Sequence, residues 1–157
     1  MTPAVDAAAA AGIEVGVHPY DHDPSHPSYG MEAAEALGVD PEEVFKTLVV
    51  ELADGRLALA VVPVETTLDV KAVAAALGAK KAVMADPQRA ERVTGYVVGG
   101  ISPVGTKTAL PTVVEETALA LDLLYCSGGR RGLDISLRPA DLVSLTGAVA
   151  APIARWR

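Results

Sequence analysis

The segment from Val44 to Val64 constrains the fold of this chain more than any other part of the sequence. Residues 44–53 read VFKTLVVELA and residues 56–64 read RLALAVVPV, two runs dominated by apolar and β-branched side chains, which are typical of strands. Asp54-Gly55 between them is a strong signal for a tight turn that joins antiparallel strands. We therefore predict a β-hairpin whose two strands lie at the centre of a sheet.

Short helices and further strands alternate on both sides of this hairpin. Helix start and stop residues, such as Thr2-Pro3 and Gly12, delimit several helices. We expect helices at 2–12, 31–37 and 69–77 and from Asp86-Pro87 and Pro139 onward, strands from Val15 and at 81–85, 110–114, 121–126 and 133–137, and a turn at 127–132. Residues 18–30 contain three prolines and are expected to form an irregular loop. The alternation predicts a mixed α/β fold.

The length and composition predict one domain that spans residues 1–157. A chain of 157 residues is close to the usual size of a single domain, and 50% hydrophobic residues suffice for a sizeable core. No segment has the composition of a linker. Because aromatic residues make up only 4%, we expect a core of Val, Leu, Ala and Ile with single anchors such as Phe45 and Trp156.

The charge balance limits the partners of the chain. A net charge of -7 is opposite to that of proteins that neutralise many phosphates, so the sequence argues against tight, nonspecific binding of nucleic acid and against a DNA partner. Two local basic clusters, Lys80-Lys81 and Arg130-Arg131, could still steer one end of an RNA over a Debye length of ~8 Å.

The N-terminus and the cysteine content indicate the compartment. Residues 1–15 lack the basic start and apolar run of a signal peptide, and no stretch approaches ~18 uninterrupted apolar residues. The single cysteine, Cys126, cannot form an internal disulfide, which is consistent with a reducing compartment. We expect a soluble cytoplasmic protein without membrane contact.

Lys46 is the first candidate functional residue. Side chains alternate between the faces of a strand, so Lys46 is predicted on the same face as Val44, Leu48 and Val50, with Thr47 on the opposite face. Three interpretations of a lysine on an apolar face are open. It belongs to a functional site, it protects the edge of a sheet from aggregation, or its aliphatic stem packs on apolar surface while its ammonium group reaches water.

Two glycine-rich segments and one aspartate are further candidates. The amides of Gly99-Gly100 could bind an oxyanion or a phosphate, or the segment is an ordinary tight loop. Ser127 to Gly132, with two arginines, could contact a phosphate or a terminal ribose, or form a charged hairpin turn. Asp134 is predicted on the strand face opposite its apolar neighbours Leu133 and Ile135. It is either a hydrogen-bond acceptor in a pocket or a solvent-facing residue.

The histidines and the cysteine suggest two other kinds of chemistry. His18, His22 and His26 have a four-residue spacing that would align metal ligands on a helix, but prolines between them forbid that helix, so a polar loop is the favoured interpretation and we predict no metal site. Cys126 ends an apolar strand, which is typical of a buried small residue rather than a nucleophile.

Several motifs resemble those of one known family. Lys46-Thr47, MADP, GGISPVG and SGGRRGLDI, together with the opening MTPAV and the segments HPYDHDP and TGYVVGGISP, occur in the order found in the YbaK family of tRNA deacylases. These are relatives of the editing domain inserted in many bacterial prolyl-tRNA synthetases, and the similarity runs nearly from end to end. The resemblance implies a central, barrel-like mixed sheet, largely antiparallel and surrounded by helices, with a pocket near the lysine for an aminoacylated tRNA 3′ end.

The resemblance also implies a set of site residues. Lys46 and Thr47 would be the catalytic pair, and the pocket would be lined or organised by Tyr20, Tyr29, Gly99, Gly100, Ile101, Ser127 and Asp134. Tyr29 stands where the family pattern has phenylalanine, and a buried phenol needs a hydrogen-bond partner. This difference bears on substrate preference.

The activity implied is removal of cysteine from Cys-tRNA(Pro) or Cys-tRNA(Cys), without a cofactor. Family members that edit cysteine use the substrate's own thiol to attack the ester, while the protein supplies position and electrostatics. The resemblance implies a transient complex with prolyl-tRNA synthetase, and the acidic charge predicts weak unaided binding of tRNA. Three alternatives stay open: a water-using deacylase of Ala-tRNA or another small aminoacyl-tRNA, a noncatalytic module that binds tRNA ends, and a metallohydrolase built on the histidine loop.

Overall fold

The computed structural model describes residues 1–156, and the predicted hairpin forms its centre. Strand β2 (Phe45–Leu52) pairs antiparallel with β3 (Leu57–Pro63), and Phe45 lies opposite Pro63. At the turn, Asp54 Oδ1 accepts a hydrogen bond from the Arg56 amide at 3.0 Å, and Gly55 has a φ of 90°. The prediction of a hairpin closed by Asp54-Gly55 is confirmed.

The hairpin belongs to a five-stranded mixed sheet with the order β5-β2-β3-β6-β9. Strand β5 (Ala82–Met84) runs antiparallel to β2, whereas β6 (Thr112–Glu115) runs parallel to β3 and β9 (Val149–Ala151) parallel to β6. Strand β9 was not predicted from the sequence.

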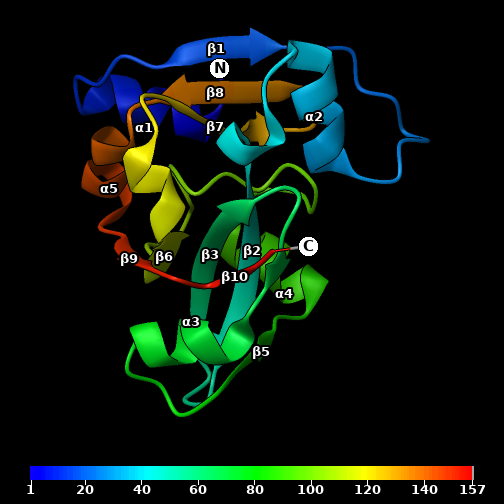
Figure 1. The fold of residues 1–157 in the computed structure, drawn as a ribbon. Coiled ribbons are helices and arrows are strands. Elements are labelled where there is room, and N and C mark those ends of the chain that lie inside the picture. Colours follow the sequence, from blue (N-terminus) through cyan, green and yellow to red (C-terminus); the bar gives the residue numbers. More distant parts are fainter. Residues whose placement is uncertain (157) are drawn as a thin grey trace.

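A second sheet lies across one end of the hairpin (Figure 1). It has the order β1-β8-β7, with β1 (Gly16–Pro19), β8 (Leu133–Leu137) and β7 (Leu124–Arg130) all antiparallel. A two-stranded sheet pairs β10 (Ala154–Arg155) with β4 (Thr67–Leu68). Over residues 1–156, five of the seven strand pairings are antiparallel, as expected, but the sheets do not close into a barrel.

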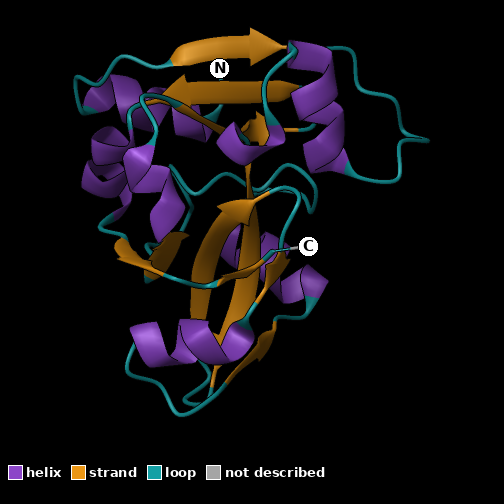
Figure 2. Ribbon diagram, in the orientation of Figure 1, coloured by secondary structure: helices purple, strands orange, loops and turns teal. Residues whose placement is uncertain are grey.

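Short helices surround these sheets, as Figure 2 shows. They are α1 (Pro3–Ala10), α2 (Tyr29–Leu37), α3 (Val70–Ala76), α4 (Pro87–Thr94) and α5 (Pro139–Thr146), with 3₁₀ turns at Pro41–Glu43 and Glu116–Ala120. Side chains cap four N-termini, those of α1, α2, α3 and α4, at Thr2, Ser28, Asp69 and Asp86. Helix α2 begins at Tyr29, two residues earlier than predicted, because Ser28 supplies the cap.

The core covers both faces of the hairpin, so every residue of β3 is buried. Phe45, Val49 and Val61 lie in a cluster with Ala90 of α4, whereas Val50 and Ala60 pack in a second cluster with Val73 of α3. Burial on both faces explains why these strands are apolar at successive positions and not at alternate ones.

Three predictions about particular segments need correction or completion. Phe45 is a core anchor, but Trp156 is 49% exposed, so its prediction as an anchor was wrong. The predicted turn at 127–132 is mostly strand, because β7 continues to Arg130 through a register shift after Ser127, and the chain reverses only at Arg131-Gly132. Arg157, the last residue of the predicted domain, lies outside the described residues. Within residues 1–156 no helix is long and apolar enough to cross a membrane.

Candidate active site

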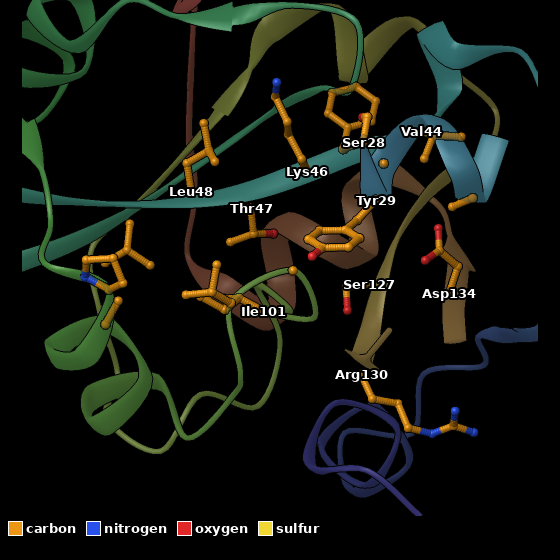
Figure 3. Close-up of a pocket in the computed structure, with 18 of the residues that line it drawn as sticks. Ser28, Tyr29, Val44, Lys46, Thr47, Leu48, Ile101, Ser127, Arg130 and Asp134 are labelled. Carbon is orange, nitrogen blue, oxygen red and sulfur yellow. The ribbon is translucent and has the colours of Figure 1, made fainter. Parts of the chain in front are cut away.

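A cavity of about 380 Å³ lies where the hairpin meets the second sheet. Its walls come from β2, the start of α2, the loop after α4, and the facing ends of β7 and β8 (Figure 3). Eight of the nine predicted site residues line it, namely Tyr20, Tyr29, Lys46, Thr47, Gly99, Ile101, Ser127 and Asp134. The ninth, Gly100, is buried beside the lining residues Gly99 and Ile101 but is not among the lining residues itself. The structure thus brings together residues from five distant segments.

The pocket opens along an unpaired edge of β2. Strand β5 pairs with β2 only over Val50–Leu52, and an isolated bridge joins Val44 to Tyr125, so among the described residues no strand pairs with the stretch between them on the edge opposite β3. Val49 O accepts a hydrogen bond from the Ala85 amide on this edge at 3.0 Å. Because backbone groups alternate between edges, Thr47 directs its N–H and C=O to the same edge, toward the pocket.

Lys46 and Thr47 lie on opposite faces of β2, as their adjacency predicts (Figure 3). Lys46 shares its face with Leu48 and Val50, as predicted from the alternation of side chains along the strand, and these two residues belong to one hydrophobic cluster. Its Nζ donates a hydrogen bond to the carbonyl of Thr66 at 2.7 Å. The ammonium group is therefore fixed at the pocket wall and points away from the Thr47 side chain.

Thr47 offers the pocket a buried hydroxyl. Its Oγ1 is inaccessible to solvent and, among the described residues, has no hydrogen-bond partner. Figure 3 shows this oxygen directed toward Tyr29, with Ile101 nearby. A buried hydroxyl without a partner costs about 1–3 kcal/mol, so Thr47 is poised to bind a polar atom of a ligand.

Tyr29 occupies the first position of α2, where the Ser28 cap starts the helix at the pocket wall. The guanidinium carbon of Arg131 lies 4.0 Å from the centre of the Tyr29 ring, and the His22 ring lies 5.8 Å from it. Sequence patterns gave no signal for this stack, because a cation over an aromatic face depends on contact between distant segments.

The glycine loop is held against the end of β7. The Ser127 hydroxyl donates to the Gly100 carbonyl at 2.9 Å, and the Gly100 amide donates to Val97 O at 2.8 Å. The Gly100 amide is therefore occupied within the loop. Gly99, with a φ of 91°, lines the pocket together with Val98 and Ile101.

Asp134 lies in the pocket wall on β8 and is only 5% exposed. Of the two alternatives that the sequence left open, a pocket or a solvent-facing position, the structure shows the pocket. Burial raises the pKa of its carboxyl to about 7. Burial, and next the neighbouring Asp134, raise the pKa of Tyr20. A cationic group bound here would favour the ionised carboxylate and lower this pKa again.

The histidines have separate partners. His18 Nε2 bonds to Ser136 Oγ at 2.8 Å, His22 Nδ1 to Glu32 Oε1 at 2.8 Å, and His26 Nε2 to Glu35 Oε2 at 3.1 Å. Over residues 1–156 no group of three or more His, Cys, Asp or Glu side chains could hold a metal ion.

Cys126 is completely buried, and burial raises the pKa of its thiol well above the usual value, which suppresses the reactive thiolate. Among the described residues, the pocket lining includes no histidine and no cysteine. The described lining thus has a lysine, an arginine, an aspartate and several hydroxyls, but no imidazole or thiol.

Comparison with known proteins adds independent information. The profile of the aminoacyl-tRNA editing domain matches residues 26–145, a range that contains every predicted site residue except Tyr20. A protein of Enterococcus faecalis named "Putative Cys-tRNA(Pro)/Cys-tRNA(Cys) deacylase EbsC" is 39% identical over 120 residues, which cover 76% of this chain and 73% of that protein.

Two further comparisons connect the chain with prolyl-tRNA synthetase. A solved structure described as "a putative trans-editing enzyme for prolyl tRNA synthetase" superposes with a TM-score of 0.85 at 27% identity, covering 98% of this chain and 95% of that one. The proline–tRNA ligase of Shouchella clausii is 33% identical over 101 residues, 64% of this chain but only 18% of that longer enzyme.

Proposed function

Because the chain belongs to the family of aminoacyl-tRNA editing domains, we propose that it is a trans-editing deacylase that removes cysteine from mischarged Cys-tRNA(Pro). One observation carries the proposal furthest: the pocket is small and polar at selected points, yet offers neither a thiol nor an imidazole to attack an ester. Such a pocket suits a substrate that brings its own nucleophile, and cysteine does so.

The reaction proposed is an intramolecular transfer within the substrate. The cysteinyl sulfur attacks the carbonyl carbon of the ester, and the new C–S bond replaces the C–O bond to the terminal ribose. The thiol proton ends on the ribose oxygen, so the products are free tRNA and a cysteine thiolactone. The protein contributes by holding sulfur and carbonyl in the reacting geometry, which supplies a large part of many rate enhancements.

The residues of the pocket have distinct proposed roles. Lys46, anchored on Thr66, holds the terminal phosphate or the carbonyl region as a cation. Thr47 constrains the aminoacyl group through its unpaired hydroxyl. The backbone of Gly99 and Ile101 orients the amine or the carbonyl, with Gly100 as the fixed support behind them, and Asp134 accepts from the substrate's ammonium group.

Recognition of the rest of the tRNA is proposed to need a partner. The net charge of -7 disfavours extensive phosphate contacts. Of the basic pair at the pocket, Arg130 is exposed, whereas Arg131 packs on Tyr29 and is partly buried. A transient complex with prolyl-tRNA synthetase in the cytoplasm would supply the missing selectivity. Residues 1–157 then act as one editing domain in trans.

The test compares purified wild type and Lys46→Ala on Cys-tRNA(Pro) and Ala-tRNA(Pro), with loss of aminoacyl-tRNA as the readout. The proposal predicts cleavage of the cysteinyl ester, at least tenfold slower in Lys46→Ala, and little cleavage of the alanyl ester. Preference for Ala-tRNA(Pro) would indicate a water-using deacylase, and binding of both without cleavage would indicate a noncatalytic module.

A further inference from the structure

Three segments of the chain pack around the ring of Tyr29. Arg131 covers one region of its ring at 4.0 Å, and Gly99 lies so close that an added Cβ would be 2.8 Å from Tyr29 Cδ2. The His22 ring is tilted against it at 5.8 Å. Three segments that are distant in sequence therefore fix the plane of one phenol ring.

The residues that hold Tyr29 are themselves anchored. Arg131 Nη2 donates to the Val98 carbonyl at 2.7 Å, which ties the stack to the glycine loop. Glu32, only 5% exposed, accepts from the Asp23 amide at 2.8 Å and bonds to His22. Burial alone would raise the pKa of Glu32, but these hydrogen bonds outweigh burial and lower the pKa overall. Glu32 therefore stays ionised and continues to bind His22 and the Asp23 amide.

The Tyr29 hydroxyl is directed into the pocket toward Thr47 Oγ1, as Figure 3 shows. Thr47 Oγ1 is buried and, within residues 1–156, unpaired. Their surroundings are apolar, with Phe45, Ile101 and Ala33 in the same lining. Two hydroxyls that face each other in an apolar pocket, one of them without a partner, form a site for an atom that can both donate and accept a hydrogen bond.

We infer that the hydroxyls of Tyr29 and Thr47 bind the polar side-chain atom of the aminoacyl group and so select side chains with a thiol or a hydroxyl over methyl-bearing ones of the same size. The inference rests on the proposed function and adds a specificity-determining residue to it. Cysteine and serine would satisfy both hydroxyls, whereas 2-aminobutyrate, which has a methyl group in the same place, would leave them unpaired. Leaving buried polar groups unpaired is the stronger basis for discrimination, because size alone distinguishes such substrates poorly.

The experiment measures binding, so that it does not depend on the chemical step. RNA minihelices with the acceptor end of tRNA(Pro) carry cysteine, serine or 2-aminobutyrate through a noncleavable 3′-amide, and the Kd of each is determined. For wild type we expect the seryl and cysteinyl analogues to bind about tenfold more tightly than the 2-aminobutyryl analogue, the effect of roughly one well-placed hydrogen bond to a buried group.

Tyr29→Phe removes one oxygen and retains the ring under Arg131, so the fold is preserved, and it should reduce this preference at least threefold. Thr47→Val should reduce it independently. Tyr125→Phe removes a phenol outside the pocket lining and should leave the preference unchanged, which controls for the loss of a tyrosine hydroxyl as such.

The outcomes separate this inference from the proposed function. Equal affinity of wild type for the seryl and 2-aminobutyryl analogues, or an undiminished preference in Tyr29→Phe, overturns the inference while the deacylase proposal stands. Binding of none of the three analogues overturns both. A cysteinyl preference without a seryl one also overturns the inference, because the hydroxyl pair should accept either heteroatom.

Discussion

The hydroxyl of Ser127 donates a hydrogen bond to the carbonyl of Gly100 at 2.9 Å, across 27 positions of sequence. This bond joins the two glycine-rich segments that stand out in the sequence. Ser127 Oγ also accepts from the Gly129 amide at 3.1 Å, so one side chain ties the β7 bulge to the loop that carries Gly99 and Ile101.

Ser127→Ala should therefore loosen the glycine loop. We expect the free energy of unfolding to fall by about 1–2 kcal/mol, since two hydrogen bonds are lost, and kcat/KM for Cys-tRNA(Pro) to fall at least about tenfold, because the loop positions the substrate. Urea titration and single-turnover deacylation measure the two effects. Ser144→Ala, on the exposed side of α5, is the control and should change neither. Unchanged activity in Ser127→Ala would exclude a positioning role for this bond.

Gly100→Ala tests how closely the loop must approach β7. An added Cβ would lie 2.8 Å from Arg130 Cα and 2.9 Å from the Arg131 amide nitrogen, both backbone atoms that cannot move aside. We expect a loss of about 3 kcal/mol in unfolding free energy, as for other overpacked sites. Gly78→Ala is the comparison: no atom lies within 4 Å of its added Cβ, and its positive φ of 69°, which Gly100 does not share, should cost only about 1 kcal/mol. Equal losses in thermal or urea unfolding would contradict the close approach.

Asp134 should make stability depend on pH. Its pKa is about 7 in the folded protein and about 3.9 in an unfolded chain, so the folded state binds more protons between these values. The stabilisation is fully present below pH ~4 and is lost as the pH rises through about 7. Wild type should therefore lose stability relative to Asp134→Asn between pH 5 and pH 8, measured by urea unfolding at both values. A difference between the two proteins that does not change with pH would show that Asp134 is already ionised at pH 5.

Glu115 should be essential for fixing the C-terminal segment. It is 2% exposed, and its carboxylate accepts hydrogen bonds from the amides of Ile153, Ala154 and Thr117, each at 3.0 Å. Glu115→Ala should lower the free energy of unfolding by about 3 kcal/mol, because bonds to a charged group are strong and the Ile153 amide is left buried without a partner. Glu116→Ala, at an exposed position, serves as the control and should have little effect on the urea midpoint.

Local signals in the sequence were sufficient for the centre of the fold. The Asp54-Gly55 turn and the apolar runs beside it act over a few residues, and the caps at Thr2 and Asp86 likewise depend on the adjacent backbone. Strand β9 was missed because its pairing with β6 depends on a segment more than thirty positions away in sequence. Trp156 looked like an anchor from its residue type alone, but its position near the chain end leaves it half exposed.

Part of the candidate site was predicted as well, but from family motifs and not from local signals. Motifs shared with a known family, and not periodicity, placed Tyr20, Ser127 and Asp134 together, and the cavity brings them together. The stack of Arg131 on Tyr29 had no sequence signal, because a contact between the side chains of two distant segments leaves no local pattern. The raised pKa of Asp134 likewise arises from burial in three dimensions.

The most direct test of the account is the single-turnover rate on Cys-tRNA(Pro) compared with the same ester after its thiol has been methylated. If the substrate's sulfur is the nucleophile, wild type should release tRNA from the free-thiol substrate at least a hundredfold faster, and Lys46→Ala should release it from that substrate at least tenfold more slowly than wild type. Equal release from the two substrates by wild type would contradict the account, because water would then be the nucleophile in this pocket.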